Sequence, residues 1–173
     1  MLNESLKSKI QNPKSKIIFD WGDTLMRDFP DMPGPMAEWP EVHCIPGVED
    51  VLEFLNEKKF VLTVATNAGV SDTALMKAAL RRVDIEKYFQ FFFSSKELVV
   101  SKPDPGFFTE VAARIESDPK SCILIGNDYT KDISAAKKAG MITVFFNEKK
   151  LEGPFTDADI VISEMTELIK IFS

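Results

Sequence analysis

Lys16-Ile-Ile-Phe-Asp20 is a short run of β-favouring residues that ends in an acid, and Phe60-Val-Leu-Thr-Val-Ala-Thr66 is a second run of the same kind. Uninterrupted apolar runs of this length are typical of strands that are buried on both faces of a sheet. Between them, Pro46-Gly47 precedes apolar residues at the spacing of one helical face, namely Val48, Val51, Leu52 and Leu55. Residues 16–66 are therefore predicted to form a strand, a helix and a second strand.

The same alternation continues to the end of the chain. Further strands are predicted over 91–93, 122–125, 142–146 and 159–162. Further helices are predicted after a cap at Ser71, over 107–115, over 130–139 with Gly140 as the terminating residue, and over 163–172. This alternation implies an α/β fold, a three-layer α/β/α sandwich around a mainly parallel, Rossmann-like sheet. In such folds ligands bind beyond the carboxyl ends of the strands, where the strand order reverses.

Length and composition indicate one domain. The chain has 173 residues, of which 45% are hydrophobic and 28% charged, the balance of a globular domain with its own core. Residues 1–173 are assigned to this domain, with residues 1–14 expected to be a peripheral or poorly ordered N-terminal segment. The formal net charge of -6 gives no general attraction to nucleic acid or to an anionic membrane, so neither is expected as a partner.

Two features bear on the compartment. Residues 1–16 contain no apolar stretch of 7 or more residues, so they match neither a signal peptide nor a membrane anchor. The chain has two cysteines, Cys44 and Cys122, and Cys122 begins an apolar run, which favours a buried thiol over a disulfide. We therefore expect a cytoplasmic location.

Residues 25–45 interrupt the alternation directly after the first strand. This segment contains four prolines and four acids but few helix or strand signals: Pro30, Pro33, Pro35, Pro40, Asp28, Asp31, Glu38 and Glu41. Unstructured loops of this length are uncommon in compact domains and are usually functional. We therefore favour a flap that faces the substrate over a surface loop without a role in the site.

Polar residues follow three of the predicted strands. These are Asp20 and Asp23, then Thr66 and Asn67, then Asn127 and Asp128 with Asp132 four residues further on. A carboxylate at a strand end can attack phosphorus in line if a cation shields it from the anionic substrate. Mg²⁺ prefers octahedral oxygen ligands and usually retains water, so Asp20, Asp128, Asp132 and a substrate oxygen are sufficient for a shell. Lys102, and Thr66 with the following amide, are candidates to bind the transferring phosphoryl group.

Each of these residues also has an ordinary structural explanation. A carboxylate after a strand is often a helix cap, Thr66 is a β-branched residue that suits a strand, and Lys102 can be a solvated loop charge. Their number and order along the chain favour the functional interpretation.

Four segments resemble, in order, the motifs of the haloacid dehalogenase superfamily. Ile17-Ile-Phe-Asp-Trp-Gly-Asp-Thr-Leu25 is similar to the first motif, a hydrophobic strand followed by Asp-x-Asp-Gly-Thr-Leu, and Val64-Ala-Thr-Asn67 to the second, whose Ser or Thr binds phosphate. Ser101-Lys-Pro-Asp-Pro-Gly-Phe-Phe108 is close to the signature Lys-Pro-x-Pro-x-x-Phe, and residues 125–141 are similar to the fourth motif, with two acids ahead of an Ala-rich helix. The resemblance covers about residues 16–146, and a four-part match is far more specific than a single motif.

The resemblance implies a Mg²⁺-dependent phosphatase that hydrolyses a phosphate monoester or an acyl phosphate. Asp20 would be the nucleophile and form an aspartyl-phosphate. The Mg²⁺ ligands would be Asp20, Asp128, Asp132 and the carbonyl oxygen of Gly22. Thr66 and Asn67 would bind phosphate, and Lys102 would balance charge at the site.

Two positions depart from the family pattern. In the fourth motif the residue before the first acid is commonly Gly and here is Asn127, which leaves the two acids in register. The second departure is in the first motif. The family's phosphatases usually have a second Asp two residues after the nucleophile, which protonates the leaving oxygen and then activates water, but this chain has Gly22 there and Asp23 one place later. General acid-base help is worth about 10²–10⁴ in rate. Asp23 is therefore assigned as a substitute catalytic residue. A substrate whose leaving group needs no proton, and a catalytically weak binding or regulatory protein on the same fold, remain alternatives.

The resemblance also implies a member without a large cap domain, because only the loop over residues 25–45 separates the first motif from the next helix. Dehalogenases of this family lack the second Asp but use residues of a sizeable cap, so dehalogenation ranks below phosphatase activity. A capless site is open to a phosphorylated small molecule or to a phosphorylated macromolecule. Trp21, Phe29 and Trp39 either line this site or pack as ordinary core residues.

Overall fold

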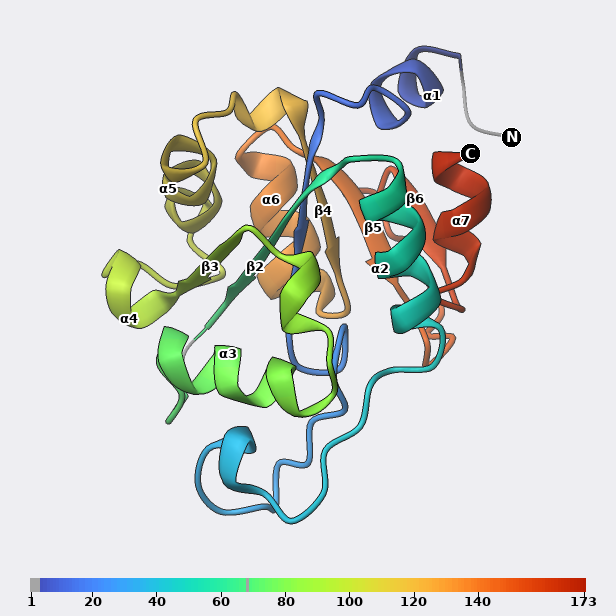
Figure 1. The fold of residues 1–173 in the computed structure, drawn as a ribbon. Coiled ribbons are helices and arrows are strands. Elements are labelled where there is room, and N and C mark those ends of the chain that lie inside the picture. Colours follow the sequence, from blue (N-terminus) through green and yellow to red (C-terminus); the bar gives the residue numbers. More distant parts are fainter. Residues whose placement is uncertain (1–3, 68) are drawn as a thin grey trace.

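Six parallel strands form one sheet in the computed structural model, which describes residues 4–67 and 69–173 (Figure 1). The strands are β1 (Lys16–Phe19), β2 (Val61–Thr66), β3 (Phe91–Ser94), β4 (Cys122–Gly126), β5 (Ile142–Phe146) and β6 (Ile160–Ile162). Their order across the sheet is β3-β2-β1-β4-β5-β6. Each begins and ends within one residue of its predicted position, because apolar runs bounded by polar residues define buried strands well.

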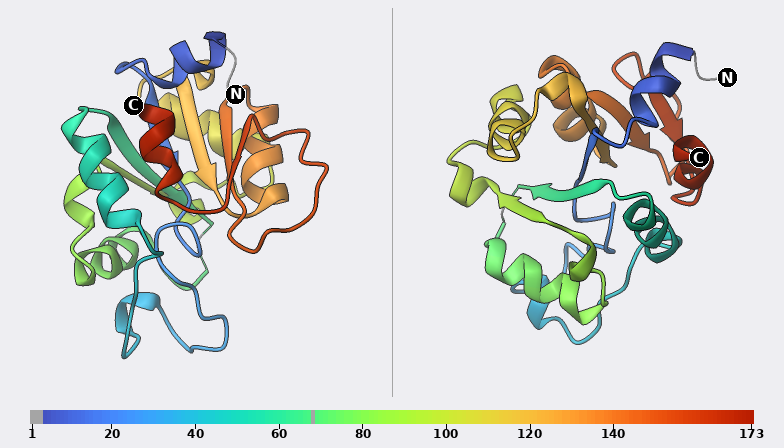
Figure 2. Two further views of the ribbon diagram at one scale, coloured as in Figure 1. Left: turned by 90° about the vertical axis from the view of Figure 1, so that its right-hand side faces the viewer. Right: turned by 45° about the horizontal axis from the view of Figure 1, so that its top comes forward.

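Helices cover both faces of the sheet (Figures 1 and 2). The core on one face includes side chains from α1 (Glu4–Ile10), α2 (Val48–Glu57), α3 (Thr73–Arg82) and α7 (Glu167–Phe172). The core on the other face includes side chains from α4 (Ser95–Leu98), α5 (Pro105–Arg114) and α6 (Ala135–Lys138). Successive strand residues point to opposite faces, so Ile17 and Phe19 join the first core and Ile18 the second. The predicted three-layer sandwich is confirmed.

Short helical turns connect these elements: η1 (Met36–Glu38), η2 (Glu86–Tyr88), η3 (Pro119–Ser121) and the π-helical turn η4 (Tyr129–Ser134). The helix predicted over 130–139 is thus divided between η4 and α6, and Gly140 ends it at a φ of +93° as predicted. None of the helices in the described part of the chain is long and apolar enough to span a membrane.

The predicted cap of α3 is wrong by one residue. Asp72 rather than Ser71 is the cap, and its side chain accepts a hydrogen bond from the Leu75 N–H at 2.9 Å. Both residues are good caps, and the acid lies at the position where its oxygen reaches the open N–H groups of the first turn.

Three differences concern the ends of the chain and a short helix. The final helix begins at Glu167, because the Glu167 carboxylate accepts hydrogen bonds from the N–H groups of Ser163 and Glu164 and holds them in a turn. In the N-terminal segment, Glu4–Ile10 forms α1 and Ile10 is fully buried, whereas residues 1–3 lie outside the described residues. The four-residue helix α4 was not predicted, because it is too short to show a helical period.

The strand order reverses between β1 and β4, because the chain passes from β1 to β2 and β3 on one side before it returns to β4 on the other. Phe19 is paired with Val64 of β2 and with Ile125 of β4. The polar residues that follow β1, β2 and β4 therefore meet at one edge of the sheet. This is the position at which α/β sheets bind ligands.

The loop over residues 25–45 lies beyond the carboxyl ends of the strands, beside α3 (Figures 1 and 2). One side chain of α3 fixes it: the guanidinium of Arg82 donates hydrogen bonds to the main-chain carbonyls of Ala37, Trp39 and Pro40, at 3.1, 2.5 and 3.2 Å. Trp39 is buried beneath these contacts, with 6% of its surface exposed. The loop is thus an ordered element of the edge where the polar residues meet.

Arg82→Met is expected to loosen this loop without unfolding the domain. Methionine keeps the aliphatic stem but removes the charged hydrogen bonds, and a local loss of about 1 kcal/mol raises cleavage of the loop roughly fivefold. Limited proteolysis with identification of the cleavage sites measures this change. The matched control is Arg81→Met, because Arg81 is a neighbouring arginine that pairs with Glu86. Equal cleavage of both variants within residues 25–45 would contradict the assignment.

Candidate active site

Asp20 lies at the centre of this edge, directly after β1. Its N–H donates to the carbonyl of Ile125 at 3.0 Å, which fixes its backbone against β4, and only 7% of the residue is exposed. Its Oδ1 accepts hydrogen bonds from Lys102 Nζ at 2.6 Å and from Thr66 Oγ1 at 3.2 Å. Its Oδ2 has one longer contact, with Thr24 Oγ1 at 3.4 Å. One carboxylate oxygen is therefore firmly held and the other is nearly free.

Lys102 joins two carboxylates in the interior. Its ammonium lies 2.6 Å from Asp20 Oδ1 and 2.7 Å from Asp132 Oδ1, with 5% of the residue exposed. Burial alone would lower the pKa of Lys102, but the charges of Asp132 and Asp20 and their hydrogen bonds raise this pKa above its ordinary value. Lys102 is therefore a permanent positive charge at the site.

Asn67 acts on Lys102 through the main chain. Its Oδ1 accepts a hydrogen bond from the Lys102 N–H at 2.8 Å, and its Nδ2 donates to the Lys102 carbonyl at 2.9 Å. Two bonds to one peptide segment fix the loop that presents the lysine. The Asn67 side chain is thus engaged in positioning Lys102, whereas the prediction of phosphate binding at this position concerns the main-chain amide.

Asp128 and Asp132 follow β4 in the turn η4. Asp128 Oδ1 accepts hydrogen bonds from the N–H groups of Thr130 and Lys131 at 3.0 and 2.8 Å, and Asp132 Oδ2 accepts one from the Asp128 N–H at 3.0 Å. Gly126 makes this packing possible, because a Cβ there would lie 2.6 Å from Asp132. Burial, together with the charge of Asp20, raises the pKa of Asp132 to about 6.

A cavity of about 230 Å³ brings all of the predicted site residues together. Its walls include Asp20, Gly22, Asp23, Asp28, Thr66, Asn67, Lys102, Asn127, Asp128, Lys131 and Asp132. Five carboxylates thus face two ammonium groups, and the cavity has a surplus of negative charge. This surplus repels an anionic phosphoryl group, and a bound cation would reduce the repulsion.

The donor chemistry of this cavity suits Mg²⁺. Carboxylate oxygens from two strand ends face the same space, and Mg²⁺ takes hard oxygen ligands and retains water. In the described part of the chain, no group of three or more His, Cys, Asp or Glu side chains is already arranged to hold a metal ion. Lys102 contacts Asp20 and Asp132, and Asp128 accepts hydrogen bonds from backbone N–H groups.

Asp23 lies at the rim of this cavity. It adopts a left-handed conformation with a φ of 55°, and its Oδ1 accepts hydrogen bonds from Arg27 at 3.2 Å and from the Asp28 N–H at 3.1 Å. Arg27 in turn makes two hydrogen bonds of 2.8 Å to the Glu148 carboxylate. This chain of contacts connects the start of the loop to the segment after β5.

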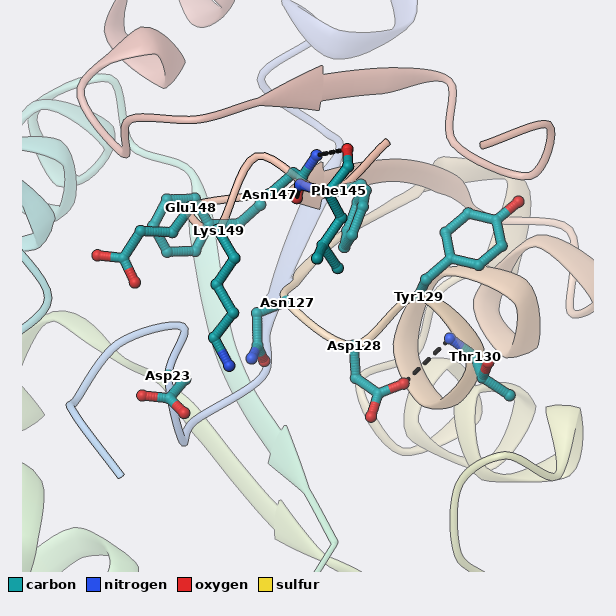
Figure 3. Close-up of a pocket in the computed structure, with 11 residues that line it drawn as sticks. Asp23, Asn127, Asp128, Tyr129, Thr130, Phe145, Asn147, Glu148 and Lys149 are labelled. Atoms are coloured by element: carbon teal, nitrogen blue, oxygen red, sulfur yellow. Dashed lines mark hydrogen bonds between the residues drawn. The ribbon is translucent and has the colours of Figure 1, made fainter. Parts of the chain in front are cut away.

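A second cavity of about 330 Å³ opens beside Asp23, toward the segment after β5 (Figure 3). Figure 3 shows the side chain of Lys149 extending toward Asp23 and Asn127, both of which line the same cavity. Asp23 and Asn127 also line the first cavity, so the two spaces adjoin. The aromatic residues lie on the other side, where Trp21 and Trp39 line a third cavity and Phe29 packs against Trp39.

Sequence reasoning assigned no role in the site to four residues of this region. Thr24 is fully buried and donates toward Asp20 and Asn127. Arg27 and Glu148 are an ion pair between segments far apart in the sequence, and Asp28 was noted only as one acid of the loop. Thr24 could have been found from its place in the first motif, whereas the other three depend on the conformation of the loop.

A buried carboxylate, a lysine and a threonine meet at the topological switch point of this α/β sandwich, the place where folds of this class bind and act on their ligands. Residues 6–146 match the family model described as haloacid dehalogenase-like hydrolase, and the chain belongs to this family. The predicted family membership is confirmed.

Individual proteins similar to this chain include two curated phosphatases and one solved structure of the same fold. The chain is 27% identical over 124 residues to the ribulose-1,5-bisphosphate 5-phosphatase of Halopiger xanaduensis, covering 72% of this chain and 51% of the relative. It is 33% identical over 117 residues to the glyceraldehyde 3-phosphate phosphatase of Methanopyrus kandleri, covering 66% and 49%. A crystal structure of an uncharacterized protein from Listeria monocytogenes serotype 4b has the same fold, with a TM-score of 0.78, 22% identity and coverage of 90% and 95%. The chain spans about half the length of the two curated relatives.

Proposed function

We propose that this protein is a Mg²⁺-dependent phosphatase that transfers a phosphoryl group from a small phosphorylated molecule to Asp20 and then to water. The observation that supports this most strongly is the buried arrangement of Asp20, Lys102 and Thr66. One oxygen of Asp20 is held by a permanent cation and a hydroxyl, and the other has a single long contact. This is the arrangement that a carboxylate needs in order to act as an oriented nucleophile.

The proposed reaction has two steps. In the first, a carboxylate oxygen of Asp20 attacks phosphorus, the bond from phosphorus to the substrate oxygen breaks, and that oxygen takes up a proton and leaves as an alcohol. In the second, water attacks the same phosphorus and gives up a proton, and the bond to Asp20 breaks to release inorganic phosphate. Lys102 and the hydroxyl of Thr66 stabilise the charge on the phosphoryl oxygens throughout.

Asp20, Asp128, Asp132 and the Gly22 carbonyl are proposed to bind Mg²⁺. The bound ion would offset the surplus of negative charge and let an anionic substrate approach an anionic nucleophile. The relatives named above act on phosphorylated sugars and trioses by their names, which supports a substrate of similar size and chemistry.

The test is a panel of phosphorylated small molecules assayed for phosphate release with Mg²⁺ and with a chelator. We expect turnover with Mg²⁺ and none with the chelator. Asp128→Asn should raise the Mg²⁺ concentration needed for half-maximal activity by at least about tenfold, the loss typical even of residues that only support a ligand. Because Asp128 also caps a turn, the matched control is Asp118→Asn, which makes the same substitution at a cap outside the cavity.

A second candidate function is a catalytically weak binding or regulatory protein on the same fold, which the glycine at position 22 favours. Phosphate release from no member of the panel, together with saturable binding of one of them, would support this alternative. Full activity in the presence of the chelator would contradict the role of Mg²⁺.

A further inference from the structure

Gly22 leaves an open position beside the nucleophile. The family's phosphatases usually have their proton donor at this position, and the first step proposed above needs a proton at the leaving oxygen. A glycine has no side chain to supply it. If the chain hydrolyses alkyl phosphates at a useful rate, another acid has to reach the same space.

Asp28 reaches that space from the loop. A Cβ built on Gly22 would lie 3.4 Å from Asp28 Oδ2, 3.5 Å from its Cβ and 3.6 Å from its Cγ. The Asp28 carboxyl therefore lies against the volume into which a side chain at position 22 would extend.

The position of Asp28 also suits a group that meets the leaving part of a substrate. It lines the cavity that contains Asp20 and also the adjoining one lined by Trp21 and Trp39. A phosphoryl group at Asp20 whose ester substituent extends toward the tryptophans would place its bridging oxygen beside Asp28. The Asp28 carboxyl would thus contact such a substrate where its phosphoryl group and its ester substituent join.

Asp23 is engaged differently. Its Oδ1 accepts hydrogen bonds from the Arg27 guanidinium and from the Asp28 N–H, and Arg27 is held by Glu148. This oxygen of Asp23 is thus already engaged by two donors at the rim of the cavity. Its bond to the Asp28 N–H orients the main chain that carries the Asp28 side chain.

We infer that Asp28, six residues after the empty position, supplies the general acid-base function that Gly22 lacks, and that Asp23 is a positioning residue for it. This inference rests on the proposed phosphatase activity. The Asp23 carboxylate thus holds the main chain of the segment after β1 in place, and the Asp28 carboxyl contacts the substrate.

The test compares kcat/KM for an alkyl phosphate with kcat/KM for p-nitrophenyl phosphate, whose leaving group needs no proton. Asp28→Asn is expected to lower the first by about 10²–10³-fold and the second by less than about tenfold, because only the alkoxide requires general acid catalysis. Asp23→Asn should lower the first more than the second as well, but by a smaller factor than Asp28→Asn does, because Asp23 acts through the Asp28 main chain and asparagine keeps an oxygen for the Asp28 N–H. Asp31→Asn is the matched control, since Asp31 is an acid of the same loop that lines a different cavity.

A rescue experiment tests whether the location of the carboxyl group matters, rather than the residue that carries it. Gly22 has no left-handed φ, and a Cβ there meets only ordinary van der Waals contacts, so it can accept an acid. The double variant Gly22→Asp with Asp28→Ala, in which the alanine clears the space beside position 22, is expected to recover at least about tenfold of the activity that Asp28→Ala loses on the alkyl phosphate. Recovery would support a shared location for the two carboxyl groups.

The outcomes are distinguishable. If the wild type hydrolyses neither substrate with Mg²⁺, the proposed function fails and this inference fails with it. If the wild type is active but Asp28→Asn affects both substrates equally or neither, only the inference is overturned. A loss selective for the alkyl phosphate that is larger in Asp23→Asn than in Asp28→Asn would assign the proton transfer to Asp23.

Discussion

Asp20→Asn is expected to abolish phosphate release, by about 10³-fold or more, as is typical when a catalytic nucleophile is removed. The amide nitrogen and oxygen of asparagine are poor nucleophiles. Among the residues that the structure describes, no second carboxylate accepts hydrogen bonds from both Lys102 and Thr66. Steady-state release of inorganic phosphate with Mg²⁺ measures the loss on every substrate that the wild type accepts.

The same variant is expected to fold at least as well as the wild type. Asparagine has the shape of aspartate and keeps an oxygen for the Lys102 and Thr66 hydrogen bonds, while the cavity loses one of its surplus negative charges. A thermal melt in chelator provides this control. Activity that survives the substitution would contradict the nucleophile assignment, and a collapse of the melting temperature would leave Asp20 with a structural role.

Lys102→Met is expected to have the largest effect on stability. Removing the ammonium leaves Asp20 and Asp132 buried side by side without their shared partner, and breaking a buried pair in this way costs about 3–5 kcal/mol. For a chain of this length that corresponds to a fall in Tm of roughly 6–20 °C. Activity should fall as well, because the fixed charge at the phosphoryl oxygens is lost.

Calorimetry or a dye-monitored melt in chelator measures this effect, and Mg²⁺ should restore part of the lost stability by neutralising the same two carboxylates. The matched control is Lys131→Met, because the Lys131 ammonium lies 3.7 Å from Asp128 and its side chain is 58% exposed. A change within about 0.5 kcal/mol is expected there. Equal effects of the two substitutions would contradict the role of Lys102 as the buried counterion.

The sequence was sufficient for the fold and for the residues at the strand ends. Phe19, Thr66 and Asn127 lie at or next to the ends of adjacent strands, so a parallel sheet necessarily brings the following side chains to one edge. Asp20, Lys102 and Asp132 are in direct contact as a result. Local patterns and the family motifs both describe this part of the molecule.

The loop was beyond prediction for a physical reason. Its conformation depends on Arg82 and on the pair of Arg27 and Glu148, partners that lie 43 and 121 residues away from the atoms they hold. No local period or turn signal encodes such contacts. The position of Asp28 beside Gly22 follows from them, and so does the difference between its environment and that of Asp23.

The central claim is that a phosphoryl group is transferred to Asp20, and chemical trapping of that intermediate tests it most directly. The enzyme is mixed with substrate and Mg²⁺, quenched within one turnover and reduced with borohydride, which converts an aspartyl-phosphate to homoserine. Peptide mass spectrometry should find homoserine at position 20 of the wild type, and no such product when Asp20→Asn is treated in the same way. Reduction at another acid, or steady turnover with unmodified Asp20 at every quench time, would contradict the account.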